Sequence, residues 1–439
     1  MTGYRTSLVD ENPDVRQPLG AAYGRLWAAA VTSRFGDAVR TPALALLAAS
    51  LTRDPRLIAA VVVAGQLPPL LFGLLAGVYA DRWDRRRTMA IVDAARSVLV
   101  GALAVLVLTG SVGIGALAVV AFLLAGLGAL FDAAAFAVLP SVVPAERLPA
   151  ANGRLAAGTA VAGGFVGAPV AGLLFALGAA LPFAVDAASF AVAALLALTL
   201  PAHGVTDPAA ASRRSVWREA GDGLRWIRRE PTLLRITALS AASNLAISGL
   251  IAVMVLYALE VLRVPEAGYG AFMATAVLGG LAGGLGAGRL AARVGLRTGL
   301  RWVLTAQTLA LVVLAFSRHP VPGAIALAVF SAGSTTWNAL WSGYGQRHVP
   351  AGLLGRVGSA QRVAGLVAAP VGAVLAGFTA NAYGLPPVAY AAAAVFAVLT
   401  VVAWRVLGTG AASVPAGTPV PAGVLPTPDR AGGGRVPGP

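Results

Sequence analysis

A series of twelve apolar windows constrains this chain more than any other feature. They lie near residues 24–50, 57–80, 88–110, 113–139, 154–178, 180–201, 233–259, 268–292, 299–316, 320–344, 359–383 and 385–407. A helix needs about 20 apolar residues to cross a bilayer. Backbone polar groups in lipid must be satisfied internally, which leaves helices or closed barrels, and continuous apolar runs favour helices. The sequence therefore predicts an all-α integral membrane protein with twelve transmembrane helices.

The composition and the placement of charge agree with a membrane protein. Only 12% of the 439 residues are charged, against about 25% in a soluble domain. The net charge of +15 would suggest nucleic acid in a soluble protein. Here all 33 basic residues are arginine, and 26 of them fall on one side if both termini are cytoplasmic. That asymmetry predicts a multi-pass protein of the cytoplasmic (inner) membrane with both termini inside and no nucleic-acid partner.

The chain divides into five parts. A polar N-terminal tail (1–23) shows no cleavable signal, and two groups of six windows (24–201 and 233–407) flank a basic segment (202–232). In that segment the apolar residues of SVWREAGDGLRWIRRE recur at helical spacing, which predicts an amphipathic linker on the cytoplasmic membrane surface. The Pro- and Gly-rich tail (408–439) cannot bury a core, so we expect it to be disordered.

The two groups of windows repeat one another. GVYADRWDRR at 77–86 aligns with GRLAARVGLR at 288–297, and both follow an even-numbered window. A parallel duplication predicts two pseudo-symmetric six-helix bundles with a substrate site between them at the bilayer midplane. The copies differ in one respect, because Asp81 of the first becomes Ala292 in the second.

The hinge GVYADRWDRRR at 77–87 resembles the signature of the major facilitator superfamily, G-x-L-A-D-R-x-G-R-[RK]-x, which lies between transmembrane helices 2 and 3. Tyr79 and Asp84 replace the usual Leu and Gly, and the matching residues are Gly77, Ala80, Asp81, Arg82, Arg85 and Arg86. The resemblance implies that this segment is a conformational switch. It implies that Asp81 is a latch against the start of the eleventh helix, which we place near Gly358 and Ser359, where the helix dipole favours an anion.

A second stretch, GGFVGAPVAG at 163–172, resembles the fifth-helix motif of antiporters in this superfamily, G-x-x-x-G-P-x-x-G. Ala168 is inserted before the proline, and the matching residues are Gly163, Gly167, Pro169 and Gly172. With SRFGDAV, VDAASF and LLGRVGSAQR, the chain is similar to the branch containing drug-efflux proteins and the enterobactin exporter. It departs from many drug antiporters because the fourth window contains no arginine, so a coupling scheme based on that arginine does not carry over.

Charges within spans are costly and are candidates for function. The first window holds Arg34, Asp37 and Arg40 at spacings of three, so neighbouring members can contact each other along one side of a helix. They form either a self-neutralising structural cluster or, through Asp37, part of a proton relay. Asp132 in the fourth window is a second candidate for proton coupling, or else a partner for an arginine of a neighbouring span. We expect Asp93 and Arg96 to pair with each other, and Asp186 to have a packing or interfacial role.

Polar and aromatic residues within the windows are candidates for a substrate cavity. Trp337 and Trp341 share a helix face, where a ligand could stack or where the rings could face lipid. Gln66 lies beside two prolines at a predicted kink. The complete set of cavity candidates is Arg34, Gln66, Asn244, Trp337, Asn338 and Trp341.

Other classes of function have little support in the sequence. The chain has no cysteine and no lysine, so it lacks disulfides, thiolate chemistry and a Walker motif, and we expect no enzyme activity, cofactor or bound metal. The favoured function is proton-coupled export of an amphipathic drug, siderophore or secondary metabolite. An importer or facilitator of a metabolite, and a non-transporting receptor or scaffold, remain as alternatives. The expected partners are the lipid bilayer, protons and a small molecule; the oligomeric state is not predicted, and a monomer fits.

Overall fold

The computed structural model describes residues 19–82, 84–201, 221, 224–228, 231–348 and 354–406, and the elements assigned in these stretches are helices. The first group comprises α1 (Ala21–Leu51), α2 (Pro55–Arg82), α3 (Arg85–Leu108), α4 (Ile114–Val142), the short 3₁₀ helix η2 (Ala145–Arg147), α5 (Leu148–Ala160), the π-helix η3 (Val161–Gly167), α6 (Ala168–Leu177) and α7 (Leu181–Leu198). The second comprises α9 (Pro231–Leu256), the π-helix η5 (Tyr257–Val261), α10 (Glu266–Val294), α11 (Leu296–Phe316), α12 (Pro320–His348), α13 (Leu354–Tyr383) and α14 (Pro386–Val406).

The helices coincide with the predicted apolar windows, so the all-helical membrane class is confirmed. Within the described stretches, nine helices are long and apolar enough to cross a membrane by length and composition. Residues 1–18 of the predicted N-terminal tail, the predicted C-terminal tail and most of the predicted linker, 202–232, lie outside the described residues, and residues 21–23 already belong to α1.

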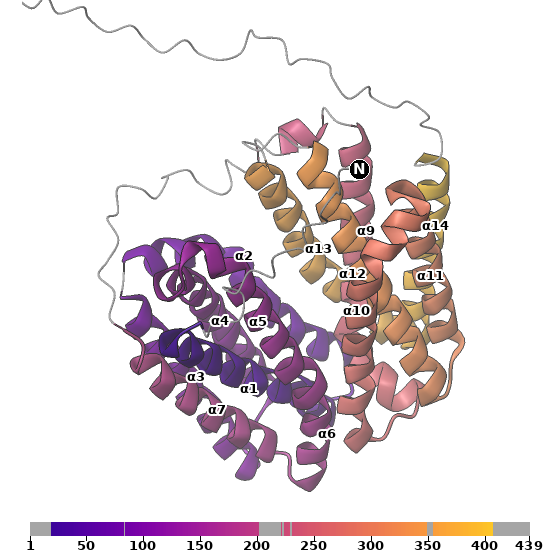
Figure 1. The fold of residues 1–439 in the computed structure, drawn as a ribbon. Coiled ribbons are helices and arrows are strands. Elements are labelled where there is room, and N and C mark those ends of the chain that lie inside the picture. The colour runs from indigo at the N-terminus through magenta and orange to yellow at the C-terminus, as the bar shows by residue number, and fades with distance from the viewer. Residues whose placement is uncertain are drawn as a thin grey trace, which may run out of the picture.

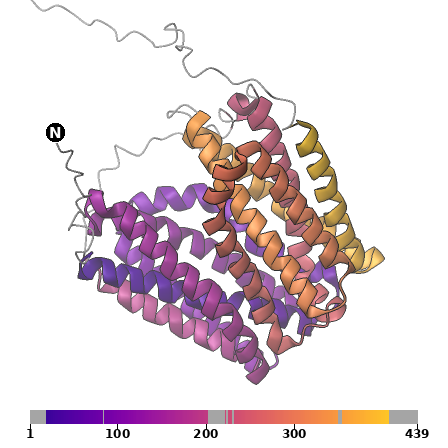
Figure 2. The ribbon, with the colours of Figure 1, turned by 45° about the vertical axis from the view of Figure 1, so that its right-hand side comes forward.

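The two groups of helices stand side by side (Figures 1 and 2). In the first group, Leu103, Phe183 and Phe190 are fully buried; in the second, Tyr257 and Phe396 are, each with 1% exposure or less. The Tyr257 hydroxyl donates a hydrogen bond to the carbonyl of Leu314, 2.9 Å away, so this core also ties η5 to α11.

Small residues bring helices of the second group into close contact. Gly279 and Gly283 of α10 face α12, where a Cβ added at either position would collide with the backbone of Ala328 or Ala332. The glycine-rich stretch 279–288 therefore acts as the close-packing face that membrane helices use where no hydrophobic effect drives association.

Among the close contacts that join the two groups, three illustrate how one end is closed. A Cβ added at Gly172 of α6 would lie 2.6 Å from the carbonyl oxygen of Ala267 at the start of α10, and one added at Gly377 of α13 would lie 2.9 Å from the Cβ of Ala59 in α2. An ion pair of 3.1 Å connects Arg53 with Glu260. All three lie near the connections 52–54 and 262–265. Figure 1 shows the ribbons of the two groups close together at this lower end, by α6, and apart at the upper end.

One helix contains an irregularity that was not predicted, and one predicted helix start was wrong. The fifth window is a helical stretch that contains the π-turn η3, because the inserted residue of the glycine motif has to be accommodated and a π-turn takes up one more residue than an α-turn. Helix α13 is already formed at Leu354, so Gly358 and Ser359 lie in its second turn rather than at its start. The polar residues after Leu354 continue the helix beyond its apolar part.

Candidate functional site

A cavity of about 1000 Å³ lies between the two groups of helices. Its wall in the second group is almost wholly apolar, and includes Ile247, Leu250, Met254, Val255, Met273, Leu311 and Phe330. Its wall in the first group contains the charged side chains of Arg34, Asp37, Arg40, Arg96 and Asp132. A molecule filling this cavity would meet an apolar surface on one side and ionised groups on the other.

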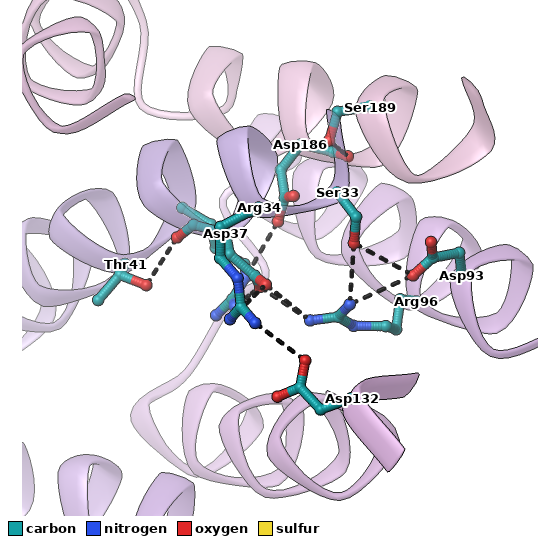
Figure 3. A network of polar contacts seen from close by, with 10 residues as sticks. Ser33, Arg34, Asp37, Thr41, Asp93, Arg96, Asp132, Asp186 and Ser189 are labelled. Carbon is teal, nitrogen blue, oxygen red and sulfur yellow. Dashed lines mark hydrogen bonds and ion pairs between the residues drawn. The ribbon is translucent and has the colours of Figure 1, made fainter. Parts of the chain in front are cut away.

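Asp37 of α1 is the centre of the charged wall (Figure 3). Its Oδ1 accepts hydrogen bonds from Arg40 at 2.5 Å and from Arg96 of α3 at 2.8 Å, while Arg34 lies 3.9 Å from Oδ2. The predicted contacts along α1 are thus present. The contact with Arg96 was not predicted, and it supplies a second close guanidinium to a carboxylate that is only 16% exposed.

Arg40 also reaches α7, where its Nε lies 2.9 Å from Oδ2 of Asp186. Asp186 is completely buried, in agreement with the packing role expected from sequence, but its part in the charged network was missed. Gly36 makes room for it, because a Cβ added there would collide with Oδ1 of Asp186 and with the hydroxyl of Ser189.

The predicted pair of Asp93 and Arg96 is also present, with 3.2 Å between Oδ1 and the guanidinium. Both side chains are buried, and the hydroxyl of Ser33 donates to the same Oδ1 at 3.4 Å. The guanidinium of Arg96 lies 4.1 Å from the ring centre of Phe190, within cation–π range. Arg96 is therefore held between two carboxylates and an aromatic face.

Asp132 of α4 has the alternative role considered from sequence, as partner of an arginine in a neighbouring helix. Its Oδ1 accepts a hydrogen bond of 2.9 Å from Arg34. The side chains of Asp132 and Arg34 are 60% and 47% exposed, so this pair forms the open side of the network, toward the cavity.

The predicted cavity residues divide into two sets. Arg34 and Gln66 line the cavity, and Oε1 of Gln66 is buried without a hydrogen bond from the described residues. Trp337 lies one turn beyond the cavity-lining Ser334, where α9 covers that face of α12, and its indole donates to Ser240 at 3.0 Å. Asn244, Asn338 and Trp341 are likewise outside the cavity wall.

The glycines of the motif at 163–172 face two neighbouring helices, α1 and α10. A Cβ added at Gly167 would lie 2.5 Å from the Cβ of Ala38 in α1, and Gly163 faces Arg34 and Ala38 at ordinary contact distance. Gly172 makes the close contact with α10 described above. Pro169 lies just after the π-turn η3 within one continuous helical stretch, and membrane helices tolerate proline at such irregular positions. The motif thus packs against α1, behind the charged wall, and against the other group of helices.

The hinge is only partly described. Gly77, Asp81 and Arg82 belong to the last turns of α2, but their side chains lie outside the described part of the chain, and so does the predicted latch. Arg86 donates a hydrogen bond of 3.0 Å to the carbonyl of Leu200 after α7, and Arg85 begins α3. Asp84 caps α3 by accepting from the N–H of Arg87, which explains an acid where the family signature has glycine.

Comparison with known proteins identifies the family. The model of the Major Facilitator Superfamily matches residues 26–373. The chain belongs to this superfamily, as its hinge and fifth-helix motifs indicated.

A relative with an assigned role is the multidrug efflux pump Tap of Mycolicibacterium fortuitum, which is 28% identical over 74% of this chain and 81% of its own length. An uncharacterized MFS-type transporter of Mycobacterium tuberculosis is 33% identical over 33% of each chain.

Solved structures share the fold at low identity. The nucleoside transporter NupG superposes with a TM-score of 0.69 at 14% identity, covering 89% of this chain and 100% of its own. A bacterial homologue of the iron transporter ferroportin in its inward-facing state reaches 0.70 at 17% identity, with 89% and 99% coverage. An outward-facing structure of such a homologue reaches 0.56 at 19% identity, with 88% and 99% coverage.

Proposed function

We propose that this protein is a secondary active transporter that exports amphipathic small molecules in exchange for protons by alternating access. The observation that carries the proposal is the cavity of about 1000 Å³ with an apolar wall on one side and a charged network on the other. A similar volume holds drug-sized ligands in other proteins. The relative named a multidrug efflux pump supports export of such molecules.

The proposal includes twelve membrane spans in two bundles of six, with both termini in the cytoplasm. The contacts near the connections 52–54 and 262–265 then close the extracellular end, and the cavity opens to the cytoplasm. The higher TM-score against an inward-facing ferroportin homologue than against an outward-facing one supports this assignment. In the outward state, Asp81 would close the cytoplasmic end as a latch, together with Arg82, Arg85 and Arg86.

Coupling to protons rests on the charged wall. Asp132 faces the cavity and Asp37 lies behind it, so protons can reach the buried carboxylates from the cavity side. A carboxylate is less costly to bury when it is neutral, so protonation alters the relative free energies of the two conformations. Gln66 would offer its free Oε1 to a donor on the substrate.

Import or facilitated movement of a metabolite is the second candidate, since a nucleoside transporter shares the fold. The efflux relative and the antiporter-like motif favour export. A non-transporting receptor or scaffold would tolerate neutral substitution in the charged wall, whereas the exporter would not. We propose no catalytic reaction, and no metal or cofactor takes part in the transport scheme.

Accumulation of ethidium, a fluorescent lipophilic cation, tests the proposal in cells that lack other efflux pumps. Cells producing the wild-type protein should retain less ethidium than empty cells, and a protonophore should remove the difference. Asp37→Asn should abolish the difference at equal protein level in the membrane. Glu146→Gln, at an exposed acid of η2 away from the charged wall, is the matched control and should behave as wild type. Extrusion unchanged by the protonophore or by Asp37→Asn would count against proton-coupled export.

A further inference from the structure

Among the described residues, the charged network contains one more acid than base. Four aspartates, Asp37, Asp93, Asp132 and Asp186, face three arginines, Arg34, Arg40 and Arg96. With every group ionised, the network would have a net charge of −1. An uncompensated charge inside a membrane protein is costly, and such groups commonly become neutral by binding a proton. One proton is therefore expected among these four carboxyl groups.

Two of the carboxyl groups are poor places for that proton. Asp37 accepts hydrogen bonds from two guanidinium groups, which favour its ionised form. Asp132 is 60% exposed and pairs with Arg34, so it is solvated in its ionised form. The remaining two, Asp93 and Asp186, are both completely buried.

Asp93 has better compensation than Asp186, although its Oδ2 also lacks a hydrogen-bond partner among the described residues. Its Oδ1 accepts from Arg96 and from the hydroxyl of Ser33. Asp186 has a single charged contact, with Nε of Arg40, and neither of its oxygens accepts a well-directed hydrogen bond from the described residues. Arg40 and Arg96 are each shared with Asp37, so Asp93 differs from Asp186 by the well-directed hydrogen bond from Arg96 and by the hydroxyl of Ser33.

The surroundings of Asp186 suit a neutral carboxyl group. The charged side chains around it are Arg40 and Asp37 of α1 and Arg96 of α3, with Asp93 beyond Arg96. The Ser189 hydroxyl donates its own proton to the Asp186 carbonyl, which leaves its lone pairs free to accept. That hydroxyl and Oδ1 of Asp186 border the same small space above Gly36. A proton on Oδ1 thus has an acceptor close by.

We propose that Asp186 is the proton-binding site of this transporter and is protonated in the present conformation. Its role in transport rests on the proton coupling proposed above. On release, the O–H bond at Oδ1 breaks and its electron pair stays on the carboxylate. The proton passes by way of Asp37 to water in the cavity. Arg40 then shifts its interaction from Asp37 to Asp186, while Arg96 continues to neutralise Asp37. The sequence candidates Asp37 and Asp132 act as relay and entrance rather than as the resting place of the proton.

Infrared spectroscopy of the purified, reconstituted protein tests this without measuring transport. At neutral pH, wild type should show the carbonyl band of a protonated carboxyl group that does not exchange rapidly with solvent. The band should shift in Asp186→Glu, which changes that carboxyl group but keeps the charge of the network, and it should be unchanged in Asp93→Glu. Its absence in wild type, or a shift in Asp93→Glu with none in Asp186→Glu, would overturn the assignment.

A milder pair of variants covers the case in which Asp186→Glu does not fold. Ser189→Ala removes the hydroxyl beside the free oxygen of Asp186 and should shift the band and the pH at which it disappears. Ser33→Ala makes the same change beside Asp93 and should leave both unaltered. An effect of Ser33→Ala alone would contradict the proposal. If transport is unaffected by a protonophore but the infrared band still depends on Asp186, proton-coupled transport is refuted and the assignment of the proton to Asp186 stands.

Discussion

Gly172 offers a direct way to disturb the contact that closes one end of the molecule. In Gly172→Ala the new Cβ would lie 2.6 Å from the carbonyl oxygen of Ala267 and 3.1 Å from the nitrogen of Gly270. Carbon atoms make favourable contacts at about 3.5–4.0 Å, so α6 and α10 would have to separate by about 1 Å. Overpacking of this kind costs about 1–3 kcal/mol. A conformation in which this end is open avoids the cost, so the equilibrium should shift toward it by about 5–150-fold.

Because the chain has no cysteine, spin labels can be placed at two introduced cysteines alone. Leu177 at the end of α6 and Glu266 at the start of α10 are exposed and lie on opposite sides of the contact. Distances measured by pulsed electron resonance should show a larger long-distance population in Gly172→Ala than in wild type. Gly101→Ala is the control, because its added Cβ meets only Ala187, at 3.9 Å. Identical distance distributions for Gly172→Ala and Gly101→Ala would refute the gating role of this contact.

Three further outcomes are expected. Arg53→Ala removes the exposed ion pair with Glu260, which contributes about 0.2–1 kcal/mol. The same spin labels should therefore report a shift of the equilibrium toward the open end of less than about fivefold. A larger shift would mean that the ion pair controls the closed end. Asp81→Asn should slow transport in proteoliposomes with little change in substrate affinity, whereas a loss confined to affinity would exclude the latch. Trp337→Phe loses the hydrogen bond to Ser240, which contributes about 1 kcal/mol. It should lower the melting temperature and leave transport unchanged. A change in transport would mean that the ring binds substrate.

Much of the fold was predictable because lipid imposes a simple rule on the sequence. The apolar windows marked the helices to within a few residues, since a segment in lipid has to hydrogen-bond its own backbone polar groups and does so as a helix. The π-turn η3 was not predicted, although Ala168, the extra residue in the glycine motif, was a visible sign of it. The start of α13 was placed too late because its first turns are polar and lie outside the apolar window.

The charged wall was predictable where its contacts are local. Arg34, Asp37 and Arg40 follow one another along α1, and Asp93 and Arg96 are one turn apart, so spacing alone indicated these pairs. The contacts of Arg96 with Asp37 and of Arg40 with Asp186 join different helices, and helix packing cannot be worked out from spacing.

One signal in the sequence could have indicated the whole network. The interiors of the first six windows contain several charged residues, and charges inside a membrane bundle almost always have partners. Trp337 was a candidate for the cavity because it shares a helix face with Trp341, but its indole contacts α9 instead. Spacing along a helix does not show which neighbouring helix covers a given face.

The central claim is that a substrate and a proton move in opposite directions through the cavity beside the charged wall. Its most direct test is the pH inside proteoliposomes that contain the purified protein and a trapped pH-sensitive dye. When an outward gradient of ethidium is imposed at equal pH and zero membrane potential, wild type should acidify the interior as substrate leaves. Asp186→Asn should move substrate without any change in internal pH. Substrate efflux from wild-type vesicles with no accompanying acidification would contradict the account.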